Sequence, residues 1–246
     1  MTRRKKMQES IITVFVLLFL VVAVLCFLLN MPRNSTVGES YLDVSDYLPG
    51  HHDLEIMQGT SEYLILVNKT HGLDDSYEPA DLKSVSQTAD DRAARYQNLR
   101  AEAADAFDQL TQEASEEGLT IVLTTGYRPY SYQKQLYDTY LKSNGNTWTE
   151  HYSAEPGHSE HQTGLAADVS SPSADYELKA EFADTAEGKW LAQNAHRFGF
   201  IIRYPDGRED ITGYKYEPWH IRYVGIDYAT EIYNRNLTLE EFLGEI

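Results

Sequence analysis

The sequence predicts an α+β fold, a single compact domain with a small, mostly antiparallel sheet flanked by helices and preceded by an N-terminal transmembrane helix. Segments typical of strands and of helices follow one another without a regular strand–helix alternation, which disfavours a parallel α/β sheet. The chain of 246 residues is long enough for one domain of roughly 180–200 residues plus appendages. An apolar run near the N-terminus lies outside that domain and predicts the membrane helix.

The apolar run covers residues 11–29, which are 19 residues without a charge. A helix of that length spans roughly 28 Å, close to the thickness of the hydrocarbon layer of a bilayer. Residues 1–10 are basic, so the positive-inside rule predicts a cytoplasmic N-terminus and an extracytoplasmic body. A cleaved signal peptide is the alternative, although the run is longer than a usual signal core and no small-x-small site follows it at once.

The predicted organisation has four parts: a cytoplasmic basic tail at 1–10, a transmembrane anchor at 11–30, a polar linker at 31–60 and the folded domain at 61–246. We therefore expect a single-pass protein of the cell membrane. Its one cysteine, Cys26, lies in the apolar run, so the exported domain has no disulfide. A metal ion in that domain could have no thiolate ligand and would be held by histidine and carboxylate side chains.

The charge of the chain excludes one class of partner. The formal net charge is -17 at pH 7, although residues 1–10 are basic. A body so acidic is a poor match for nucleic acid, because binding to phosphates requires Lys and Arg side chains. We therefore expect no nucleic-acid partner.

The first elements of the domain are a short apolar strand, a long helix and a second strand. The strand is predicted over residues 63–67. Residues 89–117 predict the clearest helix, because they are rich in Ala, contain neither Pro nor Gly, and are followed by Gly118, a natural stop. Residues 119–125 are rich in β-branched side chains and predict the next strand.

The middle of the domain is predicted to contain a helix, a loop and a buried strand. Ser131 is a candidate N-cap for a helix over residues 132–142. The Asn-Gly-Asn sequence at 144–146 predicts a loop. Residues 165–169 predict a buried strand.

The last third is predicted to alternate helices and strands. Thr185 is a candidate N-cap for a helix that ends near residue 198. Strands are predicted over residues 200–204 and 219–224. The Thr-x-x-Glu sequence at 238–241 is typical of a capping box and predicts a short last helix.

Two segments about fifty residues apart carry the chemistry. They contain two imidazoles, His161 and His220, and a carboxylate, Asp168, that could hold one metal ion, and Glu217 lies three residues before His220. A hydrolytic zinc site needs this inventory: three protein ligands, one open position for water and a nearby carboxylate. Gly164 lies between His161 and Asp168, and a tight turn there could bring the two side chains together. The spacing alone leaves open that Asp168 only caps a turn.

The same segments resemble the zinc carboxypeptidase family that includes the vancomycin-resistance D,D-carboxypeptidases, peptidase family M15. The main motifs are Ser159-x-His161-x-x-Gly164-x-Ala166-x-Asp168 and Glu217-x-Trp219-His220. Further motifs in the same order extend the likeness over roughly residues 63–235, among them Thr125-Gly126-Tyr127-Arg128 and Arg203-Tyr204-Pro205. The resemblance implies one zinc ion held by His161, Asp168 and His220, with Glu217 as the catalytic base.

The resemblance also implies the substrate, a peptidoglycan stem peptide from which a C-terminal D-alanine is removed. Such an enzyme must recognise a free carboxylate, and Arg128 follows a predicted strand end where it could bind that group bidentately. A surface ion pair is the alternative for Arg128. The resemblance implies Gln133 and Ser159 as further polar contacts, although an exposed helix amide and a turn residue would be ordinary alternatives.

Several alternative functions remain open from the sequence. An L,D-carboxypeptidase that acts on the tetrapeptide stem differs from a D,D-carboxypeptidase in the chirality of the residue before the cut, which the motifs do not report. A D,D-dipeptidase would need a pocket restricted to short substrates. A non-catalytic module that binds the cell wall is the alternative from another class, and the presence of Glu217 disfavours it because a binding module needs no base.

Overall fold

The computed structural model describes residues 61–89 and 97–246, apart from the side chains of residues 150 and 151. The predicted cytoplasmic tail, transmembrane anchor and linker lie outside the described residues. Within the described part of the chain, no helix is both long and apolar enough to cross a membrane.

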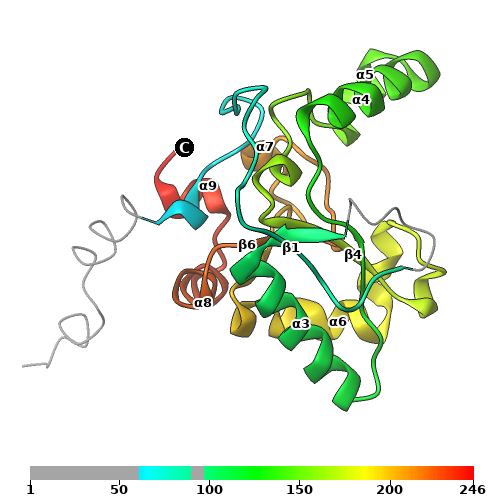
Figure 1. Cartoon of the computed structure of the whole chain (residues 1–246), viewed down its shortest axis with the longest axis vertical. Helices are drawn as coiled ribbons and strands as arrows, with labels where there is room; N and C mark the ends of the chain where they lie inside the picture. The colour runs from blue at the N-terminus through cyan, green and yellow to red at the C-terminus, as the bar shows by residue number, and fades with distance from the viewer. Residues whose placement is uncertain (1–60, 90–96) are drawn as a thin grey trace, which may run out of the picture. The chain divides into compact units, whose positions relative to one another are not determined.

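The described domain contains two small antiparallel sheets (Figure 1). A four-stranded sheet has the order β3-β4-β6-β5, and β1 and β2 form a separate pair. The strands are β1 (Leu82–Ser84), β2 (Asn98–Arg100), β3 (Val122–Thr125), β4 (Ala166–Ser170), β5 (Phe200–Ile202) and β6 (His220–Tyr223). The sheets and the helices around them confirm the predicted α+β class and the antiparallel pairing.

Helices occupy most of the rest of the described residues. The α-helices are α3 (Ala101–Glu116), α4 (Tyr130–Asn144), α5 (Asn146–Tyr152), α6 (Ala186–Asn194), α7 (Glu209–Thr212), α8 (Ile226–Arg235) and α9 (Leu239–Leu243). Short 3-10 helices are η2 (Glu62–Leu64), η4 (Glu160–Thr163), η5 (Pro172–Ala174), η6 (Ala180–Asp184) and η7 (Ala195–Phe198).

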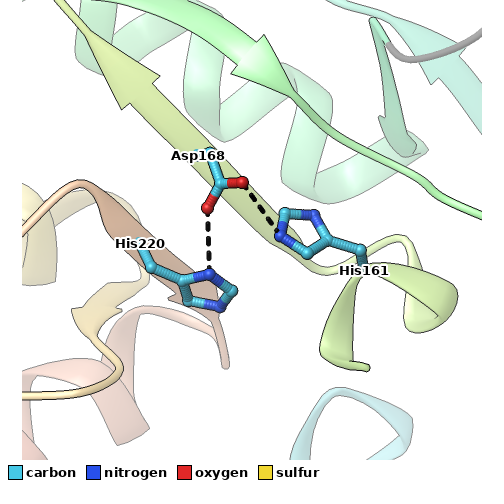
Figure 2. A group of neighbouring side chains, drawn as sticks. All are labelled: His161, Asp168 and His220. Carbon is cyan, nitrogen blue, oxygen red and sulfur yellow. Dashed lines mark hydrogen bonds and ion pairs between the residues drawn. The ribbon is translucent and has the colours of Figure 1, made fainter. Parts of the chain in front are cut away.

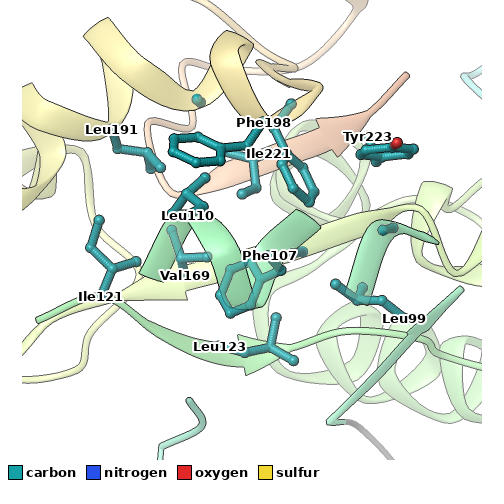
Figure 3. Close-up of a cluster of buried hydrophobic side chains, with 14 of the residues drawn as sticks. Leu99, Phe107, Leu110, Ile121, Leu123, Val169, Leu191, Phe198, Ile221 and Tyr223 are labelled. Atoms are coloured by element: carbon teal, nitrogen blue, oxygen red, sulfur yellow. The ribbon is translucent and has the colours of Figure 1, made fainter. Parts of the chain in front are cut away.

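The main hydrophobic core lies between the four-stranded sheet and the helices α3 and α6 (Figure 3). Helix α3 contributes Phe107 and Leu110, which lie three residues apart and so share one helix face. Strands β4 and β6 contribute Val169 and Ile221, and α6 contributes Leu191. A second buried cluster joins Leu64, Ile201 and Val224 to apolar side chains of α8 and α9.

The two central strands, β4 and β6, are buried on both faces of the sheet. The two faces carry different kinds of side chain. Side chains alternate between the faces of a strand. Val169 and Ile221 point into the main core, so Asp168 and His220, their neighbours in sequence, project from the other face. The second face of the sheet therefore carries polar and charged side chains in a buried setting.

The structure corrects four sequence predictions. Ser131 is not an N-cap, because α4 begins at Tyr130 after Pro129. Residues 63–67 form no strand, because Ser61 caps the 3-10 helix η2 there. The long helix begins at Ala101 rather than residue 89, because residues 98–100 pair with β1 as strand β2. The Asn-Gly-Asn loop is almost absent, since α5 begins directly at Asn146. At the start of α3, pairing of residues 98–100 with a distant strand overrode the local helix propensity.

Several local signals did locate the elements correctly. Thr185 accepts a hydrogen bond from the Gly188 backbone and caps α6, as predicted. Thr238 and Glu241 form both hydrogen bonds of a capping box at α9. The predicted strands in the second half are present with ends shifted by one or two residues.

Candidate metal centre and active-site cleft

Strand register and one tight turn bring the three predicted ligands together. Asp168 on β4 and His220 on β6 are directly opposed in the ladder. His161 lies in η4, which ends at Gly164 with a φ of 69°. That left-handed conformation suits glycine, and a Cβ there would also approach side-chain carbons of Arg100 and Leu82 at 3.1 Å.

The three side chains form a compact group (Figure 2). One candidate ligand atom from each lies within 4.8 Å of the other two. His161 Nε2 is 3.2 Å from Asp168 Oδ2, and His220 Nδ1 is 3.0 Å from Asp168 Oδ1. All three residues are at most 6% exposed. Two imidazole nitrogens and one carboxylate, convergent and buried, are a donor set that fits a single zinc ion.

In each imidazole, the nitrogen that does not face Asp168 contacts an oxygen atom of another residue. His161 Nδ1 is 2.8 Å from the carbonyl oxygen of Gly126. His220 Nε2 is 3.4 Å from the carboxylate of Glu160. Partners of this kind orient metal-binding histidines and select the tautomer that leaves the other nitrogen free.

The electrostatics of the group favour an anionic Asp168. Burial raises the pKa of Asp168, but His161 and His220 outweigh this effect and hold the pKa well below its usual value. Burial lowers the pKa of His161, which keeps that ring neutral. Burial lowers the pKa of His220, but hydrogen bonds to Asp168 and Glu160 outweigh burial and raise this pKa to about 9. A divalent cation binds neutral imidazoles beside a carboxylate anion, so it would displace the proton that His220 shares with Asp168.

Glu217 lies beside the ligand group, in the turn before β6. Its Oε2 is 3.9 Å from His220 Nδ1, and its backbone N–H donates to the carbonyl oxygen of Tyr204. Burial raises the pKa of Glu217 to about 7. A carboxyl group with a pKa near neutrality can both accept and return a proton.

Arg128 is an internal side chain rather than the surface ion pair that the sequence left open. Its side chain is 12% exposed, and Nη2 lies 3.7 Å from Asp168 Oδ2. Nη1 donates to Gln133 Oε1 at 2.6 Å, and Gln133 Nε2 in turn donates to the carbonyl oxygen of Ala154 at 2.6 Å. Gln133 is thus buried and orients the guanidinium group, and Ser159 is buried on the wall of the same cleft.

The cleft that these residues line has a volume of about 1080 Å³. Six of the seven predicted site residues line it, and Gln133 lies behind Arg128. The aromatic side chains of Tyr140, Trp148 and Tyr152, from α4 and α5, line the same cleft.

The sequence predictions missed Glu160, which lies within the first motif. Arg203 and Arg222 both donate to its carboxylate, and all three side chains are fully buried. Charged residues inside two predicted apolar strands were the available signal, because a buried arginine requires an anionic partner.

Comparison with known proteins identifies the family. The family described as "VanY: D-alanyl-D-alanine carboxypeptidase" matches residues 96–226. The putative carboxypeptidase YodJ of Bacillus subtilis (strain 168) is 44% identical over 195 residues, which are 78% of this chain and 71% of that protein.

Solved structures share both the fold and a substantial part of the sequence. The LdcB LD-carboxypeptidase is 44% identical with a TM-score of 0.71, over 75% of this chain and 86% of that chain. The vancomycin-resistance D,D-pentapeptidase VanY in complex with Zn(II) is 33% identical with a TM-score of 0.61, over 74% of this chain and 99% of that chain. The chain therefore belongs to the VanY family of D-alanyl-D-alanine carboxypeptidases and is a zinc carboxypeptidase.

Proposed function

We propose that this protein removes the C-terminal D-alanine from peptidoglycan stem peptides, with the D,D-carboxypeptidase reaction as the first candidate. One observation carries the proposal: a buried three-ligand group, a carboxyl group 3.9 Å from it and a guanidinium group 3.7 Å from it share one cleft. These are the parts that hydrolysis of a C-terminal peptide bond requires.

His161, Asp168 and His220 would hold the zinc ion. When bound, zinc would polarise the scissile carbonyl and lower the pKa of a water molecule to about 7. Glu217 would take a proton from the attacking water and deliver it to the leaving amine. Its pKa of about 7 is suited to both transfers.

Arg128 would bind the terminal carboxylate of the substrate. A planar guanidinium donates two parallel hydrogen bonds to a carboxylate, and Gln133 fixes the plane of this one through Nη1. Ser159 would add a polar contact on the wall of the cleft. Recognition of the free carboxylate would confine cleavage to the last residue of the peptide.

The direct test uses the full-length protein and a synthetic pentapeptide stem that ends in D-Ala-D-Ala. We expect mass spectrometry to detect release of one D-alanine, and we expect a zinc chelator to abolish release. Tight peptide binding without cleavage would instead identify a module that binds the cell wall.

The L,D-carboxypeptidase reaction is the second candidate, and one observation favours it. The LdcB LD-carboxypeptidase shares 44% identity with this chain, compared with 33% for the VanY D,D-pentapeptidase. A tetrapeptide stem with a single terminal D-alanine separates the candidates. Preferential cleavage of the tetrapeptide over the pentapeptide would establish the L,D reaction.

We also propose that residues 11–29 anchor the enzyme in the cell membrane with its domain outside the cytoplasm. Support comes from the uncharged apolar run and the basic residues before it. Protease added to intact cells should digest the domain, and fractionation should recover the full-length chain with the membrane.

A further inference from the structure

We propose that Glu160 is a positioning residue for the metal centre. Its carboxylate fixes the orientation of the His220 ring. The inference rests on the proposed zinc site and deepens it. Glu160 Oε2 lies 3.4 Å from His220 Nε2, and on the other edge of the ring Nδ1 lies 3.0 Å from Asp168. The imidazole therefore bridges two carboxylates, one in the ligand group and one behind it.

The surroundings of Glu160 determine what its carboxylate can do. Its Oε1 accepts hydrogen bonds from Arg203 Nε at 2.7 Å and Arg222 Nη1 at 2.6 Å, and none of the three side chains is exposed. Both guanidinium groups donate to Oε1, which leaves Oε2 to face the ring of His220. A carboxylate oxygen accepts hydrogen bonds, so this contact orients the ring with the N–H at Nε2. The lone pair of Nδ1 is then available to a metal ion.

Glu240 provides an internal comparison within the same buried cluster. Its carboxylate binds Arg203 through two hydrogen bonds, of 2.9 Å and 2.6 Å, and it is 2% exposed. Among the described residues, its side-chain hydrogen bonds reach Arg203 and Asn68 but not the ligand group. Glu160 and Glu240 therefore share the structural role of pairing Arg203, and only Glu160 contacts a ligand.

The test measures zinc affinity of the full-length protein by competition with a chromophoric chelator. Glu160→Gln should weaken zinc binding by about 10–100-fold, the usual effect of losing an outer partner of a metal-binding histidine. Glu240→Gln should change the affinity by less than about threefold, although both variants lower Tm because each leaves a buried arginine under-paired. Equal losses of affinity in the two variants would show that Glu160 acts only through general stability and would overturn the inference.

A second measurement needs no variant. In the zinc-loaded wild-type protein, ¹⁵N NMR of the imidazoles should show a proton on Nε2 of His220. Protonation at Nδ1 would overturn the inference even if Glu160→Gln fails to fold. A wild-type protein that binds no zinc would overturn the proposed function itself, so the two failures are distinguishable.

An independent observation points to a second site, on the arm formed by α4 and α5. We infer that this arm binds a sugar ring of the glycan strand to which the stem peptide is attached, a step that also rests on the proposed function. Trp148 and Tyr152 stack with ring centroids 4.9 Å apart at 28°, and Tyr140 meets Trp148 edge-on at 5.5 Å. Trp148 is 40% exposed and Tyr152 is 49% exposed.

The chemistry of the arm favours a sugar over a peptide. The arm residues on the cleft are Tyr132, Leu136, Tyr140, Trp148 and Tyr152, none of which is charged. A pyranose ring has apolar C–H faces that pack on flat aromatic rings and hydroxyl edges that suit tyrosine hydroxyls. Elsewhere the cleft is lined by charged groups that suit the peptide, including Lys179, Glu181 and Lys215.

The size of the cleft agrees with a site that binds a sugar at the arm and a peptide elsewhere. At about 1080 Å³ it is slightly larger than the roughly 300–1,000 Å³ found for sites that enclose small molecules. The arm and the ligand group line the same cleft, so a substrate can reach both.

The test compares two substrates of the full-length enzyme that carry the same stem peptide, one free and one linked to the disaccharide. A Trp148→Ala/Tyr152→Ala variant should raise KM for the linked substrate by about tenfold and leave KM for the free peptide unchanged. Tyr233→Ala is the control, because Tyr233 is similarly exposed and does not line the cleft. An equal rise for both substrates would assign the arm to the peptide, and no rise would exclude it from binding. Either result would overturn the inference.

Discussion

The floor of the cleft and the α4–α5 arm beside it differ in how their side chains are held. On the floor, His161, Asp168 and His220 are buried, and both histidines use both ring nitrogens in contacts within the domain. On the arm, helix α4 buries only Gln133, the residue that contacts Arg128. Two of the three ligands, Asp168 and His220, lie on paired strands, whereas the aromatic side chains of the arm lie on exposed helices.

The two regions differ because a small displacement of side chains would have different consequences in each. A shift of one strand register would move Asp168 and His220 to the opposite face of the sheet. The main core beneath the strands prevents such a shift, because Val169 and Ile221 would then leave it. Aromatic stacking on the arm tolerates small displacements, so little burial is needed there.

The largest expected effect belongs to Glu217 on the floor. Glu217→Gln keeps the size of the side chain and removes the proton acceptor, so kcat should fall by about 10²–10⁴-fold. Zinc content should stay at one ion per chain, because Glu217 is not among the three proposed ligands. Wild-type turnover by this variant would show that another group accepts the proton.

A smaller loss of activity is expected for substitution of Arg128, which lies where the floor meets the arm. Arg128→Lys keeps the positive charge but loses the bidentate geometry, so kcat/KM should fall by about 10–100-fold on peptides with a free C-terminus. Peptides with an amidated C-terminus serve as the control, since they have no carboxylate to bind. If the variant loses the same factor on both peptides, Arg128 has another role.

The buried charges of the floor predict a loss of stability in acid. Burial raises the pKa of Glu160, but Arg203 and Arg222 outweigh burial and hold it well below the usual value. The ionised carboxylate therefore stabilises the fold fully above the unfolded pKa of about 4.3, and this stabilisation is lost as the pH falls below it.

Urea denaturation of the chelator-treated protein at several pH values between 7 and 3 measures this effect. The free energy of unfolding should decline with falling pH more steeply in wild type than in Glu160→Gln, which has no proton to gain at that position. Parallel declines would assign the acid sensitivity to other carboxylates.

The smallest effect is expected when a side chain of the arm is removed and the stability of the fold is measured. Trp148→Ala removes a side chain that is 40% exposed and contacts two tyrosine rings, so the free energy of unfolding should fall by about 0.5–1.5 kcal/mol. Thermal unfolding followed by circular dichroism is a sufficient measurement. A larger loss of stability would mean that the arm supports the fold, and the contrast with the floor would be weaker than proposed.

The sequence by itself identified the side chains that meet at the metal centre. Histidine and aspartate with a glycine between them are chemically distinctive, and both strands that carry ligands were visible from their β-branched and apolar residues. The helix caps at Thr185 and Thr238 were also readable, because a cap is a contact between residues three positions apart.

Only the tertiary structure decided which partners lie behind these residues. Glu160 contacts His220 across 60 positions of sequence, and Arg203 joins Glu160 to Glu240 on the last helix. Strand β2 likewise exists because β1 pairs with it, although the local sequence favours helix. Such contacts form between segments that are distant in the chain, and their energies depend on burial that no short stretch of sequence specifies.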